Sequence, residues 1–416
     1  MPAGGIMTIR EDAESIMNAA LKSAMPDTAV AAALAHLPKT AGKTVLVACG
    51  KAAWQMSKAA ADVLGERISD GVCITKYDHV MGEIPHVRCY EAGHPVVDEN
   101  SVAATRKAEE LVADLKPEDI VVFLISGGGS ALFEDPRIPL SELQEITETL
   151  LACGADITEM NTLRKRLSNV KGGRFAAACR PARVFSVVLS DIIGDPLDMI
   201  ASGPACPDSA SSEDALRIAD KYGLDLSEEV MKLLREETPK ELDNVTTYIT
   251  GSVKQLCAAA EKEARRLGYE PRFLTASLNT EAREAGRFLA AIARDHQNET
   301  AGVAYICGGE TIVHITGEGR GGRNQEIALS AAEGIEGLQD TLIFSLASDG
   351  TDGPTDAAGG IVDGRTASLL REKNISISDV LRNNDAYHAL KEAGALIMTG
   401  PTGTNVNDVA VVLIKR

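Results

Sequence analysis

Short apolar runs alternate with longer amphipathic stretches along most of the chain. The runs Thr44–Cys49, Ile120–Ile125 and 183–189 are rich in β-branched residues, a pattern typical of strands buried on both faces of a parallel sheet. Apolar residues at helical spacing predict helices between these runs, including 52–64 and 101–115. Strands that alternate with helices predict a doubly wound α/β unit.

Two further stretches have helical spacing of their apolar residues. The first, 9–36, predicts one long N-terminal helix with an alanine-rich second half. The second, 161–178, is basic and predicts a helix on which Arg164 and Lys171 share one face.

A second α/β unit is predicted after two charged helices, and we expect it to begin with a strand at 246–250. The run 303–307 is followed by 311–315 after only a few residues. Such a short connection predicts an antiparallel hairpin and therefore a mixed second sheet. The expected domains are residues 1–243 and 244–416.

The composition is that of an ordinary water-soluble globular protein of 416 residues, with 44% hydrophobic and 25% charged residues. A net charge of -18 argues against binding to nucleic acid or to an anionic membrane surface. The eight cysteines form no C-x-x-C pair and the seven histidines show no zinc-ligand spacing. No signal peptide or membrane-length apolar run is evident, so we expect a cytoplasmic protein.

A glycine-rich loop directly follows the apolar run Ile120–Ile125. It consists of Ser126, Gly127, Gly128, Gly129 and Ser130. Exposed backbone N–H groups in such a loop can hold an anion, although a tight turn would use the same residues. The spacing matches neither the P-loop nor the dinucleotide-binding fingerprint.

Charged residues follow other strands of the first unit. Lys51 lies just after the first strand, where open α/β sheets bind ligands, but it could also be a solvated lysine at a helix end. Lys165 and Lys171 belong to the basic stretch and could bind phosphates or form salt bridges along a helix. Asp191 ends a strand, where a carboxylate can bind magnesium, accept a proton or cap a turn.

The second half repeats this arrangement of polar loops after strands. Gly308 and Glu310 end one strand, and Arg323 belongs to a glycine-rich loop suited to recognising carboxylate or phosphate. Asp349 follows another strand in an aspartate-rich loop, and Asn407 precedes the last strand. Taken singly, each could be a turn; together they predict a ligand-binding cleft.

These loops together resemble the class II glycerate kinases, whose C-terminal part is called the MOFRL domain. The matching motifs are Cys49-Gly-Lys-Ala-Ala, Ser126-Gly-Gly-Gly-Ser-Ala-Leu, Asn161-Thr-Leu-Arg-Lys, Lys171-Gly-Gly-Arg, Leu189-Ser-Asp-Ile-Ile-Gly-Asp, Ala201-Ser-Gly-Pro, Gly308-Gly-Glu-Thr, Gly319-Arg-Gly-Gly-Arg-Asn-Gln-Glu, Ser348-Asp-Gly-Thr-Asp-Gly-Pro-Thr-Asp-Ala-Ala-Gly, Asn384-Asp-Ala-Tyr and Thr402-Gly-Thr-Asn-Val-Asn-Asp. The resemblance implies two dissimilar α/β/α domains with the active site in the cleft between them. It also implies magnesium-dependent phosphoryl transfer from ATP to D-glycerate, usually giving 2-phosphoglycerate.

The family's important lysine and arginine correspond to Lys51 and Arg323, which we expect to clamp the reactants from opposite sides. We expect the loop 126–130 with Lys165 and Lys171 to hold the ATP phosphates, and Gly308, Glu310 and Asn407 to complete the nucleotide site.

We expect Mg²⁺ to use Asp191, Glu310 or Asp349, and Asp191 could also orient the attacking hydroxyl. Some relatives were labelled hydroxypyruvate reductases, so an NAD(P)H-dependent reductase remains an alternative. A non-catalytic sensor of a sugar acid or nucleotide is a third reading, and a homodimer is left open.

Overall fold

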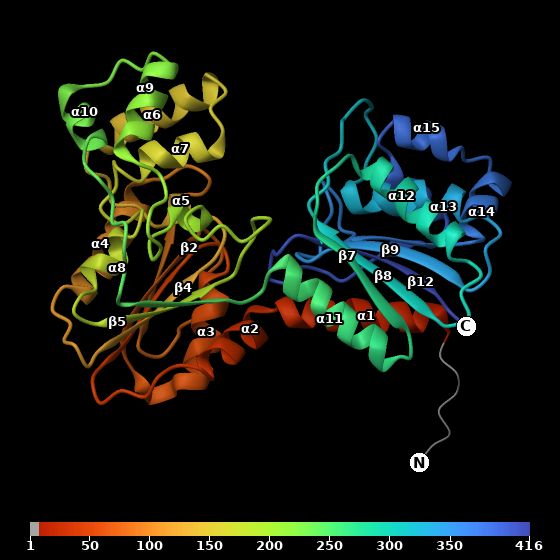
Figure 1. Cartoon of the computed structure of the whole chain (residues 1–416), viewed down its shortest axis with the longest axis horizontal. Coiled ribbons are helices and arrows are strands. Elements are labelled where there is room, and N and C mark those ends of the chain that lie inside the picture. Colours follow the sequence, from red (N-terminus) through yellow and green to blue (C-terminus); the bar gives the residue numbers. More distant parts are fainter. Residues whose placement is uncertain (1–7) are drawn as a thin grey trace. The chain divides into compact units, whose positions relative to one another are not determined.

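Two six-stranded sheets organise residues 8–416, the part of the chain described by this computed structural model (Figure 1). The first sheet belongs to an N-terminal unit, made of Pro26–Ser190 and Asp195–Thr250. The second belongs to a C-terminal unit, which contains Gly251–Arg416, the short segment Asp191–Gly194 and residues 8–25. The predicted fold class, one parallel and one mixed α/β unit, is confirmed.

The sheet of the N-terminal unit is parallel throughout, with the order β3-β2-β1-β4-β5-β6. Its strands are β1 (Thr44–Cys49), β2 (Ile68–Lys76), β3 (Val87–Ala92), β4 (Ile120–Ile125), β5 (Arg183–Val188) and β6 (Val245–Ile249). The order reverses between β1 and β4, and open α/β sheets bind ligands at the carboxyl ends of the strands beside such a reversal.

The strands β1 and β4 are fully buried and pair in register from Thr44 opposite Ile120 to Cys49 opposite Ile125. Their continuous apolar sequences are what a strand covered by helices on both faces requires. Because the two strands end level, the loops that follow them leave the sheet side by side.

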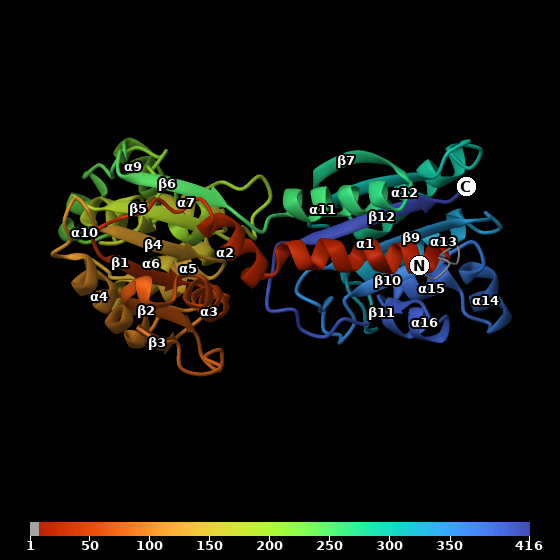
Figure 2. The same cartoon turned by 90° about the horizontal axis from the view of Figure 1, so that it is seen from below.

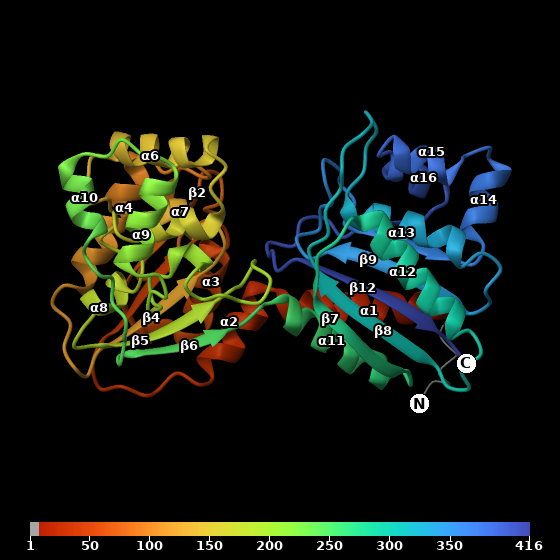
Figure 3. The same ribbon diagram turned by 45° about the horizontal axis from the view of Figure 1, so that its top comes forward.

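Helices cover both faces of this sheet. α2 and α3 pack together on one face, and α4 and α8 lie on the other (Figure 1). A buried apolar cluster joins α6, α7, α9 and α10 into a small helical cap at one end of the unit (Figure 3). The helices of this unit are α2 (Pro26–Leu34), α3 (Ala53–Leu64), α4 (Glu99–Val112), α5 (Gly129–Leu132), α6 (Leu140–Ala152), α7 (Ile157–Arg164), α8 (Arg174–Ala178), α9 (Ser212–Lys221) and α10 (Glu228–Leu234), with 3₁₀ turns η1 (Gly65–Arg67) and η2 (Ile200–Ser202).

The sheet of the C-terminal unit is mixed, with the order β11-β10-β9-β12-β8-β7. Only β7 and β8 are parallel, and every other neighbouring pair is antiparallel. The strands are β7 (Glu270–Leu278), β8 (Val303–Gly309), β9 (Thr341–Ala347), β10 (Gly359–Asp363), β11 (Leu396–Ile397) and β12 (Asp408–Ile414).

This sheet also has helices on both faces (Figure 2). α1 and α11 pack against each other on one face, and α12 and α13 pack against each other on the opposite face. The helices of the unit are α1 (Ile9–Ala24), α11 (Val253–Arg266), α12 (Ala282–Asp295), α13 (Arg323–Gly334), α14 (Thr366–Glu372), α15 (Ile377–Arg382) and α16 (Ala386–Glu392). Within residues 8–416, no helix combines the length and apolar character needed to cross a membrane.

The predicted hairpin at 311–315 is wrong. β8 ends at Gly309, and the following segment makes one isolated bridge, from Ile312 to Glu281. Both edges of β8 are already occupied, by β7 on one side and β12 on the other, so no edge remains for a hairpin partner. The second sheet is mixed because β12 and β9 run antiparallel to their neighbours.

Two predicted long helices are interrupted. The stretch 9–36 becomes α1 and α2, which are separated where Pro26 opens α2. The stretch 161–178 becomes α7 and α8, separated by turns. Arg164 and Lys171 therefore do not share a helix face.

The structure divides the chain differently from the expected boundary between residues 243 and 244. β6 pairs with β5 and completes the first sheet rather than starting the second. α1 belongs to the C-terminal unit, where its buried Asp12 accepts hydrogen bonds from the Tyr269 hydroxyl at 2.7 Å and from Lys415 Nζ at 2.6 Å. Pairing partners, which are remote in sequence, decide both assignments.

Candidate active site

The loops after β1 and β4 are joined directly by backbone hydrogen bonds. The Lys51 N–H donates to the Gly127 carbonyl at 2.8 Å, and the Ala52 N–H donates to Ser126 Oγ at 3.1 Å. Gly50 allows this close approach, because a Cβ there would lie 2.5 Å from the Ser126 carbonyl oxygen. Its φ of +119° is also one that side chains disfavour.

The Lys51 side chain extends beside the glycine-rich loop. A Cβ on Gly128, whose φ is +86°, would lie 3.0 Å from Lys51 Cγ and 3.0 Å from the His94 ring. Burial, followed by the charges of Lys51 and Lys76, holds the pKa of His94 below its usual value. The loop is therefore flanked by a lysine and by a histidine that favours its neutral form.

The far end of the glycine-rich loop is tied to the turn η2. The hydroxyls of Ser130 and Ser202 lie 2.9 Å apart, and Ser202 Oγ donates to Asn161 Oδ1 at 2.8 Å. Ala201 and Ser202 have positive φ values of 52° and 61°, which are uncommon for residues with side chains. The Ala-Ser-Gly-Pro motif thus supports the loop that follows β4.

Two buried cations, Lys171 and Arg164, hydrogen-bond to backbone carbonyls at the end of the glycine-rich loop. Lys171 Nζ donates to the carbonyls of Ser130 at 2.9 Å and Phe133 at 2.8 Å, while Arg164 Nη2 donates to the Ser130 carbonyl at 2.7 Å. The buried carboxylate of Glu134 lies 3.3 Å from Lys171 Nζ. Burial lowers the pKa of Lys171 to about 8, and Glu134 opposes that effect. Lys171 therefore contacts the loop backbone, in place of the direct phosphate contact expected from the sequence.

Lys165 is also buried, and its ammonium group is paired within the protein. Its Nζ lies 2.9 Å from Asp208 Oδ1 and 3.4 Å from Asp198 Oδ2. The salt-bridged alternative describes this lysine better than direct phosphate binding.

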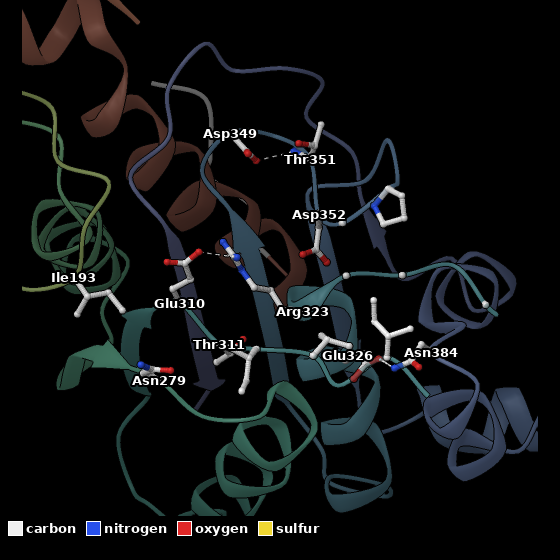
Figure 4. Close-up of a pocket in the computed structure, with 18 residues that line it drawn as sticks. Ile193, Asn279, Glu310, Thr311, Arg323, Glu326, Asp349, Thr351, Asp352 and Asn384 are labelled. Atoms are coloured by element: carbon white, nitrogen blue, oxygen red, sulfur yellow. Dashed lines mark hydrogen bonds and ion pairs between the residues drawn. The ribbon is translucent and has the colours of Figure 1, made fainter. Parts of the chain in front are cut away.

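The C-terminal unit contains a cavity of about 690 Å³ at the amino end of α13 (Figure 4). Three predicted site residues, Glu310, Arg323 and Asp349, line it. Further lining comes from the glycine-rich loop before α13 and from the 311–315 segment that was predicted to form a hairpin.

Arg323, the first residue of α13, is held by two carboxylates. Its Nε donates to Asp408 Oδ2 at 2.6 Å and its Nη2 to Asp408 Oδ1 at 3.1 Å, which is a bidentate pair. Its Nη1 donates to Glu310 Oε1 at 3.0 Å (Figure 4). Burial raises the pKa of Asp408 to about 6 against the opposing effect of Arg323, so this carboxylate is mainly ionised at neutral pH.

The start of α13 is fixed by the buried Asp352. Its carboxylate accepts the backbone N–H groups of Asn324 at 3.2 Å and Gln325 at 2.9 Å. These are N–H groups that a helix start leaves without a partner in the helix itself. Asp352 thereby sets the position of Arg323 as well.

A further carboxyl group, that of Glu326, lies one turn along α13 from Arg323. Its Oε1 accepts from Asn384 Nδ2 at 2.8 Å (Figure 4), and burial raises its pKa. Within the described chain, Oε2 of this buried residue has no hydrogen-bond partner. Among the described residues that line the cavity, Arg323 is therefore the one cation, and it lies among several carboxyl groups.

Two further predicted residues lie close to each other in the same unit. Asn407 Nδ2 donates to the backbone carbonyl of Asp191 at 3.2 Å, and Asn407 directly precedes Asp408. Gly308 instead lies inside β8, where a Cβ would be 2.6 Å from Val253 on α11. Gly308 permits close helix packing, so its predicted contact with a cofactor finds no support here.

The carboxylates of the cavity suit a magnesium ion that takes most of its ligands from phosphate oxygens and water. Among residues 8–416, no group of three or more His, Cys, Asp or Glu side chains is arranged to hold a metal. Magnesium in nucleotide sites is commonly bound through one or two carboxylates together with phosphate oxygens and water. Glu310 and Asp349, which line the same cavity, can supply that number.

The sequence prediction missed several residues that shape these sites, among them Asp352, Glu134 and His94. The sequence shows Asp352 only as part of an aspartate-rich loop, and its capping role depends on a helix that begins at Arg323, far earlier in the chain. Glu134 gave no signal beyond a lone acidic residue. His94 follows β3 in Gly-His-Pro, so its position after a parallel strand could have marked it.

The chain matches two protein-family models. Residues 12–235 match the family model described as "Domain of unknown function (DUF4147)", and residues 303–408 match that of the MOFRL family.

The chain is 50% identical to a D-glycerate 2-kinase from Thermotoga maritima over 98% of its own length and 99% of that protein. It is 37% identical to a putative hydroxypyruvate reductase from Agrobacterium vitis, over 98% of this chain and 95% of the relative. A crystal structure of glycerate kinase from Thermotoga maritima, also 50% identical, superposes with a TM-score of 0.93 over 97% of this chain and 99% of that one. The chain therefore belongs to the class II glycerate kinase family, of which the MOFRL domain is the C-terminal part.

Proposed function

We propose that this protein transfers the γ-phosphoryl group of ATP to D-glycerate and forms 2-phosphoglycerate. One observation carries the proposal: a cavity with a carboxylate-anchored arginine occurs in a chain that is 50% identical, over almost its full length, to a protein named D-glycerate 2-kinase. A guanidinium fixed in orientation is well suited to binding a substrate carboxylate.

In the C-terminal unit, Arg323 binds the glycerate carboxylate, and Asp191 orients the attacking hydroxyl. Glu310, Asp349 and Asp191 are the carboxylates available to hold Mg²⁺, which when bound neutralises phosphate charge and so stabilises the transferring group. The protein supplies position and charge, because phosphoryl transfer needs little covalent help from it.

In the N-terminal unit, Lys51 and the loop 126–130 bind the phosphates of ATP. The loop lies at the strand-order reversal beside β1 and β4, which is where this kind of sheet binds ligands. Lys171 positions the loop by donating to its backbone. Lys165 forms buried ion pairs with Asp208 and Asp198 and so contributes to structure rather than binding phosphate directly.

The direct test combines the protein with D-glycerate, ATP and MgCl₂ and measures ADP release. NMR of the product then locates the phosphate on carbon 2 or carbon 3. We expect ADP release that depends on D-glycerate, and a phosphate on carbon 2. A phosphate on carbon 3 would refute 2-phosphoglycerate as the product but would still support the proposed kinase activity.

A second candidate, hydroxypyruvate reduction, is favoured by one observation, the name of the Agrobacterium vitis relative. Against it, Gly50-Lys-Ala-Ala-Trp follows β1 where a dinucleotide-binding sheet would carry G-x-G-x-x-G. If the protein oxidises NADH with hydroxypyruvate and forms no ADP with glycerate, the reductase becomes the better supported function. Ligand binding without turnover of any acid would favour a sensor.

A further inference from the structure

Arg323 divides its N–H groups between two carboxylates that differ in their surroundings. A guanidinium has five N–H groups in a rigid plane. Asp408 occupies the edge formed by Nε and Nη2, and Glu310 occupies Nη1. Both carboxylates lie at the same end of the sheet, because Asp408 pairs with Gly309, the residue just before Glu310.

Asp408 has the character of a fixed anchor. It begins β12, a central strand held between β8 and β9, and its side chain is only 7% exposed. Its two contacts use both carboxylate oxygens. This bidentate pair is costly to break, because the buried Asp408 carboxylate would be left as an uncompensated charge.

Glu310 has the character of an exchangeable partner. Its side chain is 46% exposed, it follows the end of β8, and its contact with Arg323 is a single hydrogen bond of 3.0 Å. Exposed ion pairs contribute little free energy, so this contact can be replaced at small cost. It also lines the cavity, where a ligand would approach.

We propose that Glu310 occupies, in the ligand-free protein, the place of the substrate carboxylate on Arg323, and that the substrate displaces it while Asp408 keeps the guanidinium oriented. This inference rests on the proposed function, in which that substrate is D-glycerate. The exchange replaces one carboxylate by another, so the charge in contact with Arg323 stays constant. Glu310 is thus an internal competitor that sets the affinity for small carboxylic acids.

The test measures D-glycerate binding by isothermal titration calorimetry, without nucleotide or magnesium. Removing the competing charge in Glu310→Gln should tighten binding by about two- to fivefold, the range that corresponds to an exposed ion pair. Asp349→Asn is the matched control, because it removes one negative charge from the same cavity at a residue whose carboxylate accepts from the Thr351 N–H instead of from Arg323. Its effect should be clearly smaller.

Asp408→Asn tests the anchor and should weaken D-glycerate binding by at least about tenfold, because the guanidinium loses its fixed orientation. Circular dichroism checks that this variant folds. If it does not fold, the comparison of Glu310→Gln with Asp349→Asn decides alone.

Unchanged or weaker binding in Glu310→Gln, or an equal gain in Asp349→Asn, would overturn the inference even if the wild type phosphorylates glycerate. A panel of D-lactate, glycolate and hydroxypyruvate separates this result from failure of the proposed function. One of these acids could bind more tightly to Glu310→Gln than to the wild type while D-glycerate neither binds nor reacts. That result would support the carboxylate exchange on Arg323 and refute D-glycerate as the substrate. If no carboxylate binds, the inference is refuted, and ADP release in the kinase assay decides the proposed function separately.

Discussion

Lys51 and Arg323 lie in contrasting surroundings. Lys51 lies beside a loop of backbone groups and near His94, whose lowered pKa keeps a second cation from forming there at neutral pH. Arg323 is surrounded by carboxylates and is fixed in orientation by one of them. The first environment suits phosphate, and the second suits a small carboxylic acid.

Lys51→Ala and Arg323→Ala should each lower kcat/KM for D-glycerate phosphorylation by about a hundredfold or more, the usual effect of losing one charge-stabilising group. The Lys51 variant should retain its thermal unfolding midpoint. Lys58→Ala is the control, since Lys58 lies on the same helix as the residues after Lys51 but is exposed and pairs with Asp62. Full activity in both test variants would refute the assigned roles.

Gly50 illustrates a residue whose importance comes from a neighbour. Gly50→Ala should lower the free energy of unfolding by about 3 kcal/mol or more, because left-handed strain is added to a clash with Ser126. Gly65→Ala is the matched control. Its φ of +52° is also positive, but no described atom lies within 4 Å of the added Cβ, so only about 1 kcal/mol should be lost. Urea denaturation of both variants gives the comparison, and equal losses would contradict it.

At the scale of elements, local pattern predicted the buried strands best. β1 and β4 begin and end at the predicted residues, because a strand buried on both faces must be apolar throughout. The run 311–315 has a similar local pattern but forms no strand, since β8 has no free edge. α12 was not predicted at all, although its packing against α13 is extensive.

The turn between α7 and α8 shows how an element can serve a site indirectly. Burial holds the pKa of Lys171 near 8, against an ordinary value of 10.5, so the unfolded chain binds more protons between these two pH values. Stability should therefore rise with pH across this window.

The double variant Lys171→Met/Glu134→Gln removes both buried charges of the pair. Relative to it, the wild type should gain up to about 3 kcal/mol in free energy of unfolding from pH 8 to pH 10.5. Urea denaturation at several pH values measures this difference. Parallel pH profiles for the two proteins would show that Lys171 does not titrate in this range.

At the scale of the whole molecule, both ends of the described chain contribute to one unit. α1 packs on α11. Asp12 of α1 accepts a hydrogen bond from Lys415, which follows the last strand. A sequence boundary at residue 243 separates these partners, whereas the fold joins them.

Asp12→Ala should remove hydrogen-exchange protection from α1 and α11 while leaving the amides of β1 and β4 unchanged, because the lost contacts lie within the C-terminal unit. We expect a cost of about 2 kcal/mol from the two hydrogen bonds that Asp12 no longer accepts from Tyr269 and Lys415. Glu14→Ala is the control, since Glu14 is exposed and forms its ion pair with Arg10 on the same helix. Loss of protection in β1 would contradict the assignment of α1 to one unit.

The sequence alone determined the fold class, the buried strands, the glycine-rich loops after them and the family, because these depend on local periodicity and on motifs short enough to read in order. The tertiary structure decided which strand belongs to which sheet, that Lys165 and Lys171 are buried, and that Arg323 is shared by Asp408 and Glu310. Asp408 lies 85 residues beyond Arg323. Contacts over such separations depend on which strand edges are free and on how much solvent reaches each charge, and a one-dimensional pattern contains neither.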